Sequence, residues 1–311
     1  GGPAADRVVG DLGALGWEAE VRAAGATRGG LFADAYDALF LLAPGEELAA
    51  VELESARRLL ANGGSLVLTL GSRASDSMVA LAKGFGLGLD TAGRVVHDFA
   101  SPGASADGHS SFSSDAFAGF AAGRGYAPVK IMGGGVVPVL VPTRSELASA
   151  LLRASPAAFG ARPGESDLGV SGGGISLVTA LETRTAGRAL VLGGLGVLGG
   201  AESDQFRKDI LAWSLRERGV LRASEVRHWK EGGYGDRAGE MYRIKDELGF
   251  HVRLEEWSRT GGVGKEGAWM PFVLPDGDEL QVELTMLDPY VRTGLKHVGK
   301  VSISRSTPPL Q

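Results

Sequence analysis

The pattern of apolar and polar positions changes character along the chain. In the first third, short apolar runs alternate with segments whose apolar residues recur at helical spacing. The expected elements are a helix at 8–15, a strand at 38–42, a helix at 47–61, a strand at 65–70 and a helix at 75–83. Strands that alternate with helices predict a parallel sheet covered by helices.

The middle of the chain is less regular. Residues 98–125 are rich in Ser, Gly, Ala and Asp, which predicts a long loop, and extended apolar pieces return between 129 and 192. Ser203 to Arg218 then has the apolar face of an amphipathic helix, with Ser203 as the expected N-cap.

After Gly219 the helical periodicity disappears. Short runs, several of them alternating, are separated by Gly, Pro and Asp, which is typical of a small antiparallel β-sandwich. The expected organisation is therefore α/β plus all-β: a parallel-sheet α/β domain at 1–100, a middle α/β region at 101–219 and a β-sandwich-like domain at 220–311.

Composition narrows the classes of function. The 32 Lys and Arg against 37 Asp and Glu give a net charge of −5, which offers no electrostatic footprint for nucleic acid. The absence of cysteine excludes disulfides, thiolate nucleophiles and sulfur-based zinc sites. The longest uncharged runs have 14 residues, too short to cross a bilayer, and the first residues do not have the pattern of a signal peptide.

Two glycine motifs could carry chemistry. Gly194 to Gly199 matches G-x-G-x-x-G and lies between an apolar run and a helix, the context of a dinucleotide-binding loop, but no second strand with a ribose-binding acid follows. Gly169 to Gly173 matches G-x-S-x-G, but a strand, not a helix, is expected after Ser171. We therefore expect ordinary loops in both places.

Histidines and tryptophans give weaker signals. The five histidines show no metal-ligand spacing, and His97-Asp98 is expected to be a surface pair at the end of a strand, its side chains on opposite faces. The tryptophans could stack on sugars, although such residues more often pack in a core. Two other classes of protein thus stay open: a nucleotide-binding α/β oxidoreductase and a free-standing carbohydrate-binding module.

Five segments of the second half carry a more specific signal through their order and spacing. They are Leu211–Arg222, Tyr242–Asp246, Glu255–Trp257, Trp269–Phe272 and Leu287–Thr293. Together they resemble the family of the non-catalytic 48 kDa subunit of dolichyl-diphosphooligosaccharide–protein glycosyltransferase. Residues 36–37, 41–44, 62–68 and 95–98 are similar to the first domain of that family, a flavodoxin-like fold related to glutamine amidotransferases.

The resemblance implies a place in the oligosaccharyltransferase complex of the endoplasmic reticulum membrane, which transfers a preassembled glycan to Asn in N-x-S/T. This portion would be luminal, and a first strand, a signal peptide and a C-terminal transmembrane helix of the family are missing from the sequence. The partners implied are the multi-spanning catalytic subunit and the other subunits, and a divalent metal belongs to the catalytic subunit.

For this chain, the resemblance implies a scaffold with no catalytic, cofactor-binding or metal-binding residue. The residues that match its signatures are candidates for an interface or for packing. They are Trp213, Tyr242, Trp257, Trp269, Pro271, Asp288, Pro289, Tyr290 and Arg292. Asp288 and Arg292 are expected to form a structural pair or turn.

Overall fold

The computed structural model describes residues 3–22, 35–42, 47–90, 93–133, 135–142, 147–164, 168–200, 203–230, 248–258, 268–271, 281–284 and 297–300. The chain divides into two compact units. Unit 1 is Gly1–Val220 with Ser258–Ala268, and unit 2 is Leu221–Trp257 with Trp269–Gln311. The division lies next to the predicted boundary at Gly219, whereas the predicted regions 1–100 and 101–219 share unit 1.

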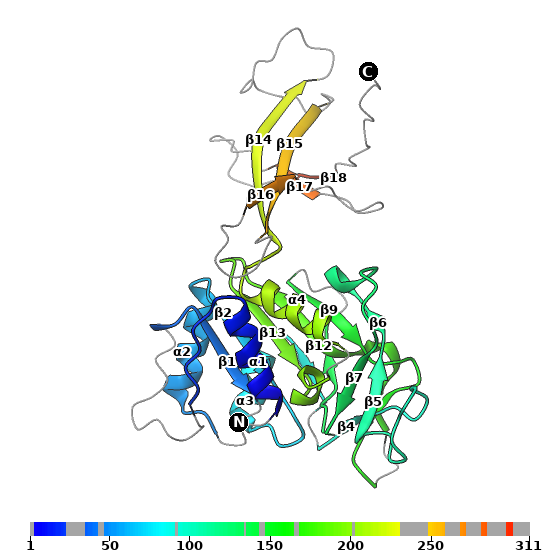
Figure 1. Ribbon diagram of the computed structural model, residues 1–311. Coiled ribbons are helices and arrows are strands. Elements are labelled where there is room, and N and C mark those ends of the chain that lie inside the picture. The colour runs from blue at the N-terminus through cyan, green and yellow to red at the C-terminus, as the bar shows by residue number, and fades with distance from the viewer. Residues whose placement is uncertain are drawn as a thin grey trace. The chain divides into compact units, whose positions relative to one another are not determined.

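Unit 1 is built on an eight-stranded mixed sheet in the order β1-β2-β13-β12-β8-β3, with β9 paired to β12 and β6 paired to β9 (Figure 1). Its strands are β1 (Ala38–Leu42), β2 (Ser65–Thr69), β3 (Gly88–Leu89), β6 (Ala116–Phe117), β8 (Val139–Leu140), β9 (Ala148–Arg153), β12 (Ile175–Glu182) and β13 (Arg188–Leu192). Strands β1, β2 and β13 are parallel neighbours. Strand β12 is antiparallel to β13, because a short turn at 183–187 joins the two as a hairpin.

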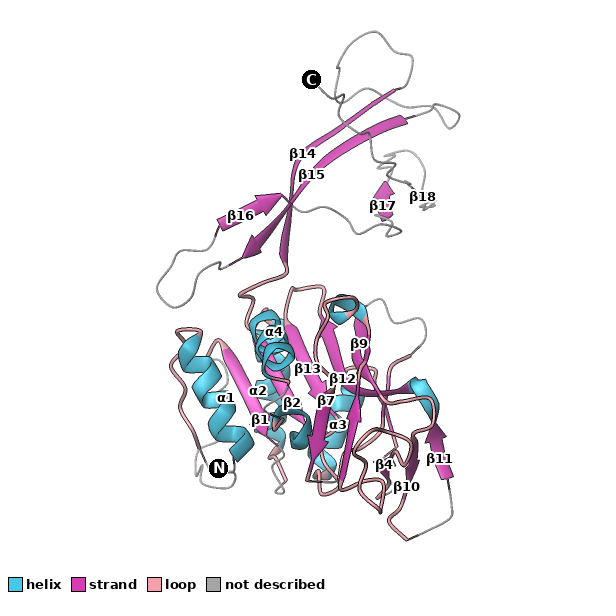
Figure 2. Cartoon of the chain, turned by 45° about the vertical axis from the view of Figure 1, so that its right-hand side comes forward, coloured by secondary structure: helices cyan, strands magenta, loops and turns pink. Residues whose placement is uncertain are grey.

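Helices cover both faces of this sheet (Figure 2). Helices α1 (Pro3–Ala14) and α4 (Asp204–Ser214) lie on one face, and α2 (Ala50–Ala61) and α3 (Asp76–Gly84) on the other. The packing of strand β2 on both sides explains why its sequence is an unbroken apolar run. Val67 packs in the cluster that contains Ile210 of α4, and its neighbours Leu66 and Leu68 pack in the cluster that contains α2 and α3. Both faces of the strand are therefore buried.

Smaller elements complete unit 1. A three-stranded sheet has the order β11-β10-β4, and a separate pair joins β5 to β7. The bounds are β4 (Val95–His97), β5 (Ser111–Ser114), β7 (Val129–Met132), β10 (Phe159–Ala161) and β11 (Leu168–Ser171), with 3₁₀ turns η2 (Gly119–Ala121), η3 (Gly172–Gly174) and η4 (Leu195–Leu198).

The described residues of unit 2 form two small sheets. Strands β17 (Gln281–Leu284) and β18 (His297–Lys300) pair antiparallel. A three-stranded sheet has the order β14 (Val220–Lys230), β15 (Leu248–Ser258) and β16 (Ala268–Pro271). The all-β character of this end is as the alternation predicts, and the sandwich arrangement stays a prediction.

The start of α4 differs from the expectation in one respect. Ser203 occupies the N-cap position, but its hydroxyl donates to the carbonyl of Gly200 and does not cap the helix. The side chain that ties this end of α4 into unit 1 is Arg207, which is buried and pairs with Asp11 of α1 at 2.7 Å and Asp204 at 2.8 Å. A buried ion pair therefore joins α1 to α4.

The N-terminus of α3 is held by a carboxylate from another segment. The backbone N–H groups of Asp76 and Ser77 donate to the two carboxylate oxygens of Glu47 at 2.9 and 3.0 Å. Hydrogen bonds from the Ser77 side chain, and from the backbone of Ser77 and Asp76, lower the pKa of Glu47. Glu47 therefore ties the segment before α2 to α3 in its charged form.

Replacing this carboxylate tests the connection through its pH dependence. Because the pKa of Glu47 is lower in the folded chain, its stabilising contribution is present above about pH 4.5 and is lost as the pH falls through the folded pKa. Glu47→Gln should lower the thermal unfolding midpoint at pH 7 and change it much less at pH 3. An equal change at both pH values would show that the charge has no role.

Candidate functional site

The buried guanidinium of Arg188 lies at the end of unit 1 where the chain leaves α4. Its Nη1 donates to the carbonyls of Trp213 at 2.8 Å and Arg218 at 2.9 Å, and its Nη2 donates to the carbonyl of Gly219 at 2.5 Å. Arg188 is only 3% exposed. One cation of β13 therefore donates to a carbonyl in the last turn of α4 and to two carbonyls of the chain that follows the helix.

Trp213 is packed into the same place. It is 8% exposed, the Arg188 guanidinium lies 4.8 Å from its ring centroid, and the Phe120 ring is stacked 5.3 Å away. Gly219 has a φ of +69° and its α-carbon approaches the indole closely, since a β-carbon there would lie 3.1 Å from Trp213. The chain can turn out of unit 1 here because residue 219 has no side chain.

Two further signature tryptophans lie together in unit 2. The rings of Trp257 on β15 and Trp269 on β16 are 5.6 Å apart, and the Arg222 guanidinium of β14 lies 4.1 Å from the Trp269 centroid. Arg222 also pairs with the carboxylate of Glu255 at 2.7 Å. This cluster of four side chains, called the Trp269 cluster below, links all three strands of the sheet.

The electrostatics of the Trp269 cluster favour charged Glu255. The side-chain hydrogen bond from Arg222 lowers its pKa, against the opposing effect of burial, and the charges of Arg222 and Arg253 lower it further. The guanidinium of Arg222 is thus fixed between a carboxylate and an indole face. An arginine held in this way covers an aromatic surface.

Of the other predicted site residues, the structure describes only Pro271. Pro271 ends β16 and is exposed. Tyr242, Asp288, Pro289, Tyr290 and Arg292 lie outside the described residues. The expected pairing of Asp288 with Arg292 therefore stays a prediction.

The G-x-G-x-x-G segment is filled by the protein's own backbone. Gly194 precedes the four-residue turn η4, and α4 begins only at Asp204. A β-carbon at Gly193 would lie 2.5 Å from the Val137 carbonyl oxygen, and one at Gly196 would collide with the Met132 carbonyl oxygen. Gly194 and Gly196 allow close packing of this turn on Val136 and Met132, which accounts for these two glycines without a pyrophosphate, whereas a β-carbon at Gly199 would be tolerated.

The other candidate motifs also have structural explanations. Ser171 ends β11 and is followed by η3 and then β12, as expected for a loop without a nucleophile elbow. Among the described residues, no three or more His, Cys, Asp or Glu side chains gather as a metal site would require. In the same residues no helix is long and apolar enough to span a membrane.

The expectation for His97 and Asp98 was wrong. Both residues are buried, at 6% and 0% exposure, because β4 is covered by β10 and by the loop that follows it. The His97 ring is stacked on Phe159 at 5.6 Å and lies 4.8 Å from the His109 ring. Strand alternation placed the two side chains on opposite faces but could not show that both faces were covered.

A small pocket of about 70 Å³ lies at the carboxyl end of β2, the edge at which α/β sheets commonly bind ligands. Ser72, Asp76 and Arg94 contribute its polar lining. The helix N-terminus beside it is already occupied, since Glu47 accepts from Asp76 and Ser77 and the Ser75 hydroxyl accepts from Met78. An anion arriving here would compete with the chain's own carboxylate.

The sequence analysis did not predict the roles of the charged residues around Trp213 and Trp269. Arg188 is a lone charge in a strand, and Arg222 and Glu255 are charges in alternating segments, where a solvated face is the ordinary interpretation. The one available signal for Arg188 was a positive charge at the start of an otherwise unbroken apolar run, 188–192.

Comparison with known proteins shows what the chain is similar to. A family model described as the OST48 middle domain matches residues 228–307. The dolichyl-diphosphooligosaccharide–protein glycosyltransferase 48 kDa subunit of Arabidopsis thaliana is 28% identical over 82% of this chain and 62% of its own length. The subunit of the same name from Caenorhabditis elegans is 27% identical over 94% of this chain and 71% of its own.

Two more matches cover less of the chain. The glycosyltransferase subunit WBP1 of Saccharomyces cerevisiae is 28% identical over 49% of this chain and 34% of its own length. A solved structure titled mmIFT52 N-terminal domain has a TM-score of 0.42 and 14% identity, over 58% of this chain and 78% of that one.

The order of elements, the signature tryptophans and these matches define the class: a two-unit chain with an α/β unit followed by a β unit, related to subunits of a glycosyltransferase. Within that class, the chain is similar to the dolichyl-diphosphooligosaccharide–protein glycosyltransferase 48 kDa subunit over most of its length, which supports its identification with that subunit. Its match spans about 62% of the length of the Arabidopsis relative.

The role of Arg188 can be tested by removing its donors. Arg188→Ala removes the buried guanidinium that donates to three carbonyls and should lower the free energy of unfolding of unit 1 by about 3 kcal/mol. Arg188→Lys should recover only part of this, because an ammonium cannot reach three acceptors in the same geometry. Arg184→Ala, an exposed arginine in the adjoining turn, is the control and should change chemical unfolding little.

A pair of glycine substitutions distinguishes packing from nucleotide binding. Gly196→Ala should destabilise unit 1 by about 2 kcal/mol because the new methyl group meets backbone. Gly199→Ala should be tolerated, since its nearest atom would be 3.5 Å away. NAD should leave the thermal midpoint of the unaltered chain unchanged. A clear upward shift with NAD would restore the oxidoreductase interpretation.

Proposed function

We propose that this chain is a non-catalytic scaffold subunit of an oligosaccharyltransferase complex, which transfers a preassembled glycan from dolichyl diphosphate to Asn in N-x-S/T. The chemistry then belongs to a separate multi-spanning, metal-dependent subunit. The relatives whose sequences match most of the chain are named as subunits of this glycosyltransferase, and this supports the assignment. An oligosaccharyltransferase complex is associated with the endoplasmic reticulum, and we place this portion of the chain on its luminal side.

One observation favours a structural role above the others. Two of the three signature tryptophans that the structure describes are covered by the chain's own arginines, Trp213 by Arg188 and Trp269 by Arg222, and the third, Trp257, packs against Trp269. The guanidinium carbons lie 4.8 and 4.1 Å from the two ring centroids, so the covered face of each indole is not available to bind a ligand. The signature residues are therefore best explained as the packing that gives the subunit its shape.

The same observation argues against the tryptophan-based carbohydrate-binding module. That class needs exposed aromatic faces, whereas Trp213 is buried and Trp269 is covered by Arg222. The glycine packing around η4 likewise removes the main support for an oxidoreductase.

Affinity purification tests the assignment directly. The full-length tagged protein is isolated from mildly solubilised membranes and the co-purifying proteins are identified by mass spectrometry. The multi-spanning glycosyltransferase subunit should be recovered in nearly equal amount. Recovery of the chain alone from a soluble fraction would contradict the proposal.

Trp269→Ala should reduce the amount of complex recovered in this experiment. The substitution removes the contacts with Trp257 and Arg222 and should cost about 2 kcal/mol, less than for a fully buried indole because Trp269 is half-buried. Met270→Ala, at a neighbouring position that is 50% exposed, is the matched control and should leave the yield unchanged. Equal yields for both variants would exclude a structural role for Trp269.

A further inference from the structure

Four aromatic rings gather at one edge of unit 1, on the small sheet β11-β10-β4 and the loop after β4. The rings of His97, Phe99 and Phe159 lie within 5.6 to 6.1 Å of one another and are nearly parallel, at 5 to 29°. The His109 ring lies 4.8 Å from that of His97. Phe99 is 57% exposed, an unusual degree for a large apolar ring in a packed group.

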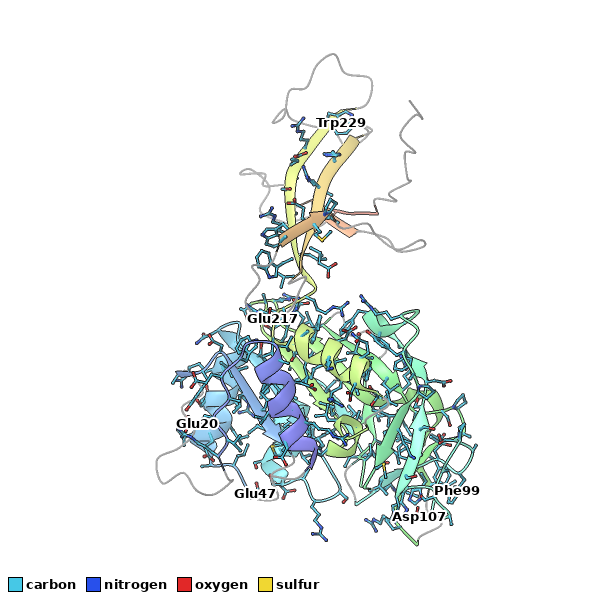
Figure 3. The ribbon with its side chains drawn as sticks, in the orientation of Figure 1. Glu20, Glu47, Phe99, Asp107, Glu217 and Trp229 are labelled. Carbon is cyan, nitrogen blue, oxygen red and sulfur yellow. The ribbon has the colours of Figure 1, made fainter. Side chains whose placement is uncertain are left out.

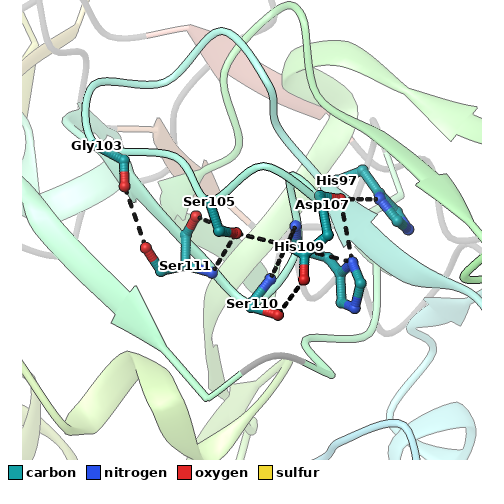
Figure 4. A network of polar contacts seen from close by, with 7 residues as sticks. All are labelled: His97, Gly103, Ser105, Asp107, His109, Ser110 and Ser111. Carbon is teal, nitrogen blue, oxygen red and sulfur yellow. Dashed lines mark hydrogen bonds and ion pairs between the residues drawn. The ribbon is translucent and has the colours of Figure 1, made fainter.

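The loop that carries Phe99 is fixed by its own hydrogen bonds. Its ends are joined where the N–H of Asp98 donates to the carbonyl of Gly108 at 2.8 Å. The carboxylate of Asp107 accepts from the hydroxyls of Ser105 and Ser110 and from the N–H groups of His109 and Ser110 (Figure 4). Phe99 and Asp107 lie at the same end of the unit (Figure 3). The exposed ring is thus presented by a preorganised loop.

Gly108 explains how the Phe99 ring is seated. Its φ is +68°, and a β-carbon there would lie 2.9 Å from three atoms of that ring. Part of the Phe99 ring therefore rests on bare backbone, and with His97 and Phe159 also packed against it the residue stays 57% exposed.

The two histidines offer hydrogen-bond acceptors beside this ring. Each Nδ1 lies 3.1 Å from the carbonyl oxygen of Asp107, which can only accept, so each neutral imidazole carries its proton on Nδ1. Both Nε2 atoms are then acceptors. The Nε2 of His97 is buried and has no hydrogen-bond partner among the described residues, and the side chain of His109 is 22% exposed.

An open aromatic face next to acceptor nitrogens suits a ligand that is apolar on one side and rich in hydroxyl donors at its rim. We propose that Phe99 and His109, supported by His97 and Phe159, form a saccharide-binding platform. One sugar ring stacks on Phe99, and one of its hydroxyls donates to the Nε2 of His109, the partly exposed histidine. The platform is separate from the tryptophans, and this proposal goes beyond the scaffold role.

Saturation-transfer NMR on the purified full chain tests the platform. The probes are methyl α-mannoside, methyl β-glucoside and N,N′-diacetylchitobiose, each titrated to obtain a Kd. At least one should receive saturation on its C–H protons, and Phe99→Ala should weaken its binding by about tenfold. His109→Phe keeps an aromatic face but removes the nitrogens, and should also weaken binding.

Leu168→Ala is the matched control, because Leu168 is 61% exposed on β11 of the same small sheet but is not one of the four rings. It should bind the probe as the unaltered chain does, and thermal unfolding of each variant confirms that it is folded. Absence of transfer to all three probes, or unchanged binding by folded Phe99→Ala, would overturn the proposal.

A protein partner is the other occupant that the experiment can reveal. If no sugar binds and Phe99→Ala loses a protein that co-purifies with the unaltered chain, the surface docks a protein and the saccharide assignment is wrong. Sugar binding is measured on the isolated chain, so its failure leaves membership of the complex untouched, and a failure to recover the complex leaves the platform untouched.

Discussion

The buried guanidinium of Arg188 is the interaction on which the rest of the structure depends. It begins β13, the strand that joins the parallel and antiparallel parts of the main sheet, and it binds the carbonyls of the chain between Trp213 and Gly219. The sheet, α4 and the exit of the chain from unit 1 therefore meet at one side chain. Its cost of desolvation is offset by three carbonyl acceptors, a partly exposed carboxylate and an indole face.

Unit 2 repeats the same physical solution. Arg222 lies over Trp269 and pairs with Glu255, so an arginine again joins strands by combining an aromatic face with a hydrogen-bonded acceptor. Signature tryptophans thus take part in the contacts that hold each unit together. This is the physical reason for proposing a structural role for the chain in a larger assembly.

The sequence predicted the elements whose signals are local. The strands at 38–42 and 65–69 and helices α2 and α3 follow from apolar runs and helical spacing. It did not predict that β12 would pair with both β9 and β13, because antiparallel partners distant in the chain leave no periodic trace. The burial of Arg188 and the ring packing around His97 were not predicted for a related reason, because both depend on other segments of the chain that cover these residues. In a sequence, a charge that will be buried cannot be distinguished from a charge on the surface.

The central claim is that this chain supports an enzyme complex without contributing to its chemistry. The most direct measurement is the rate of glycan transfer per assembled complex, with the complex quantified separately, across variants of this chain that range from stable to destabilised. The account predicts that destabilised variants lower the amount of complex while the rate per complex stays constant. A variant that assembles in full amount but transfers glycan more slowly would contradict it.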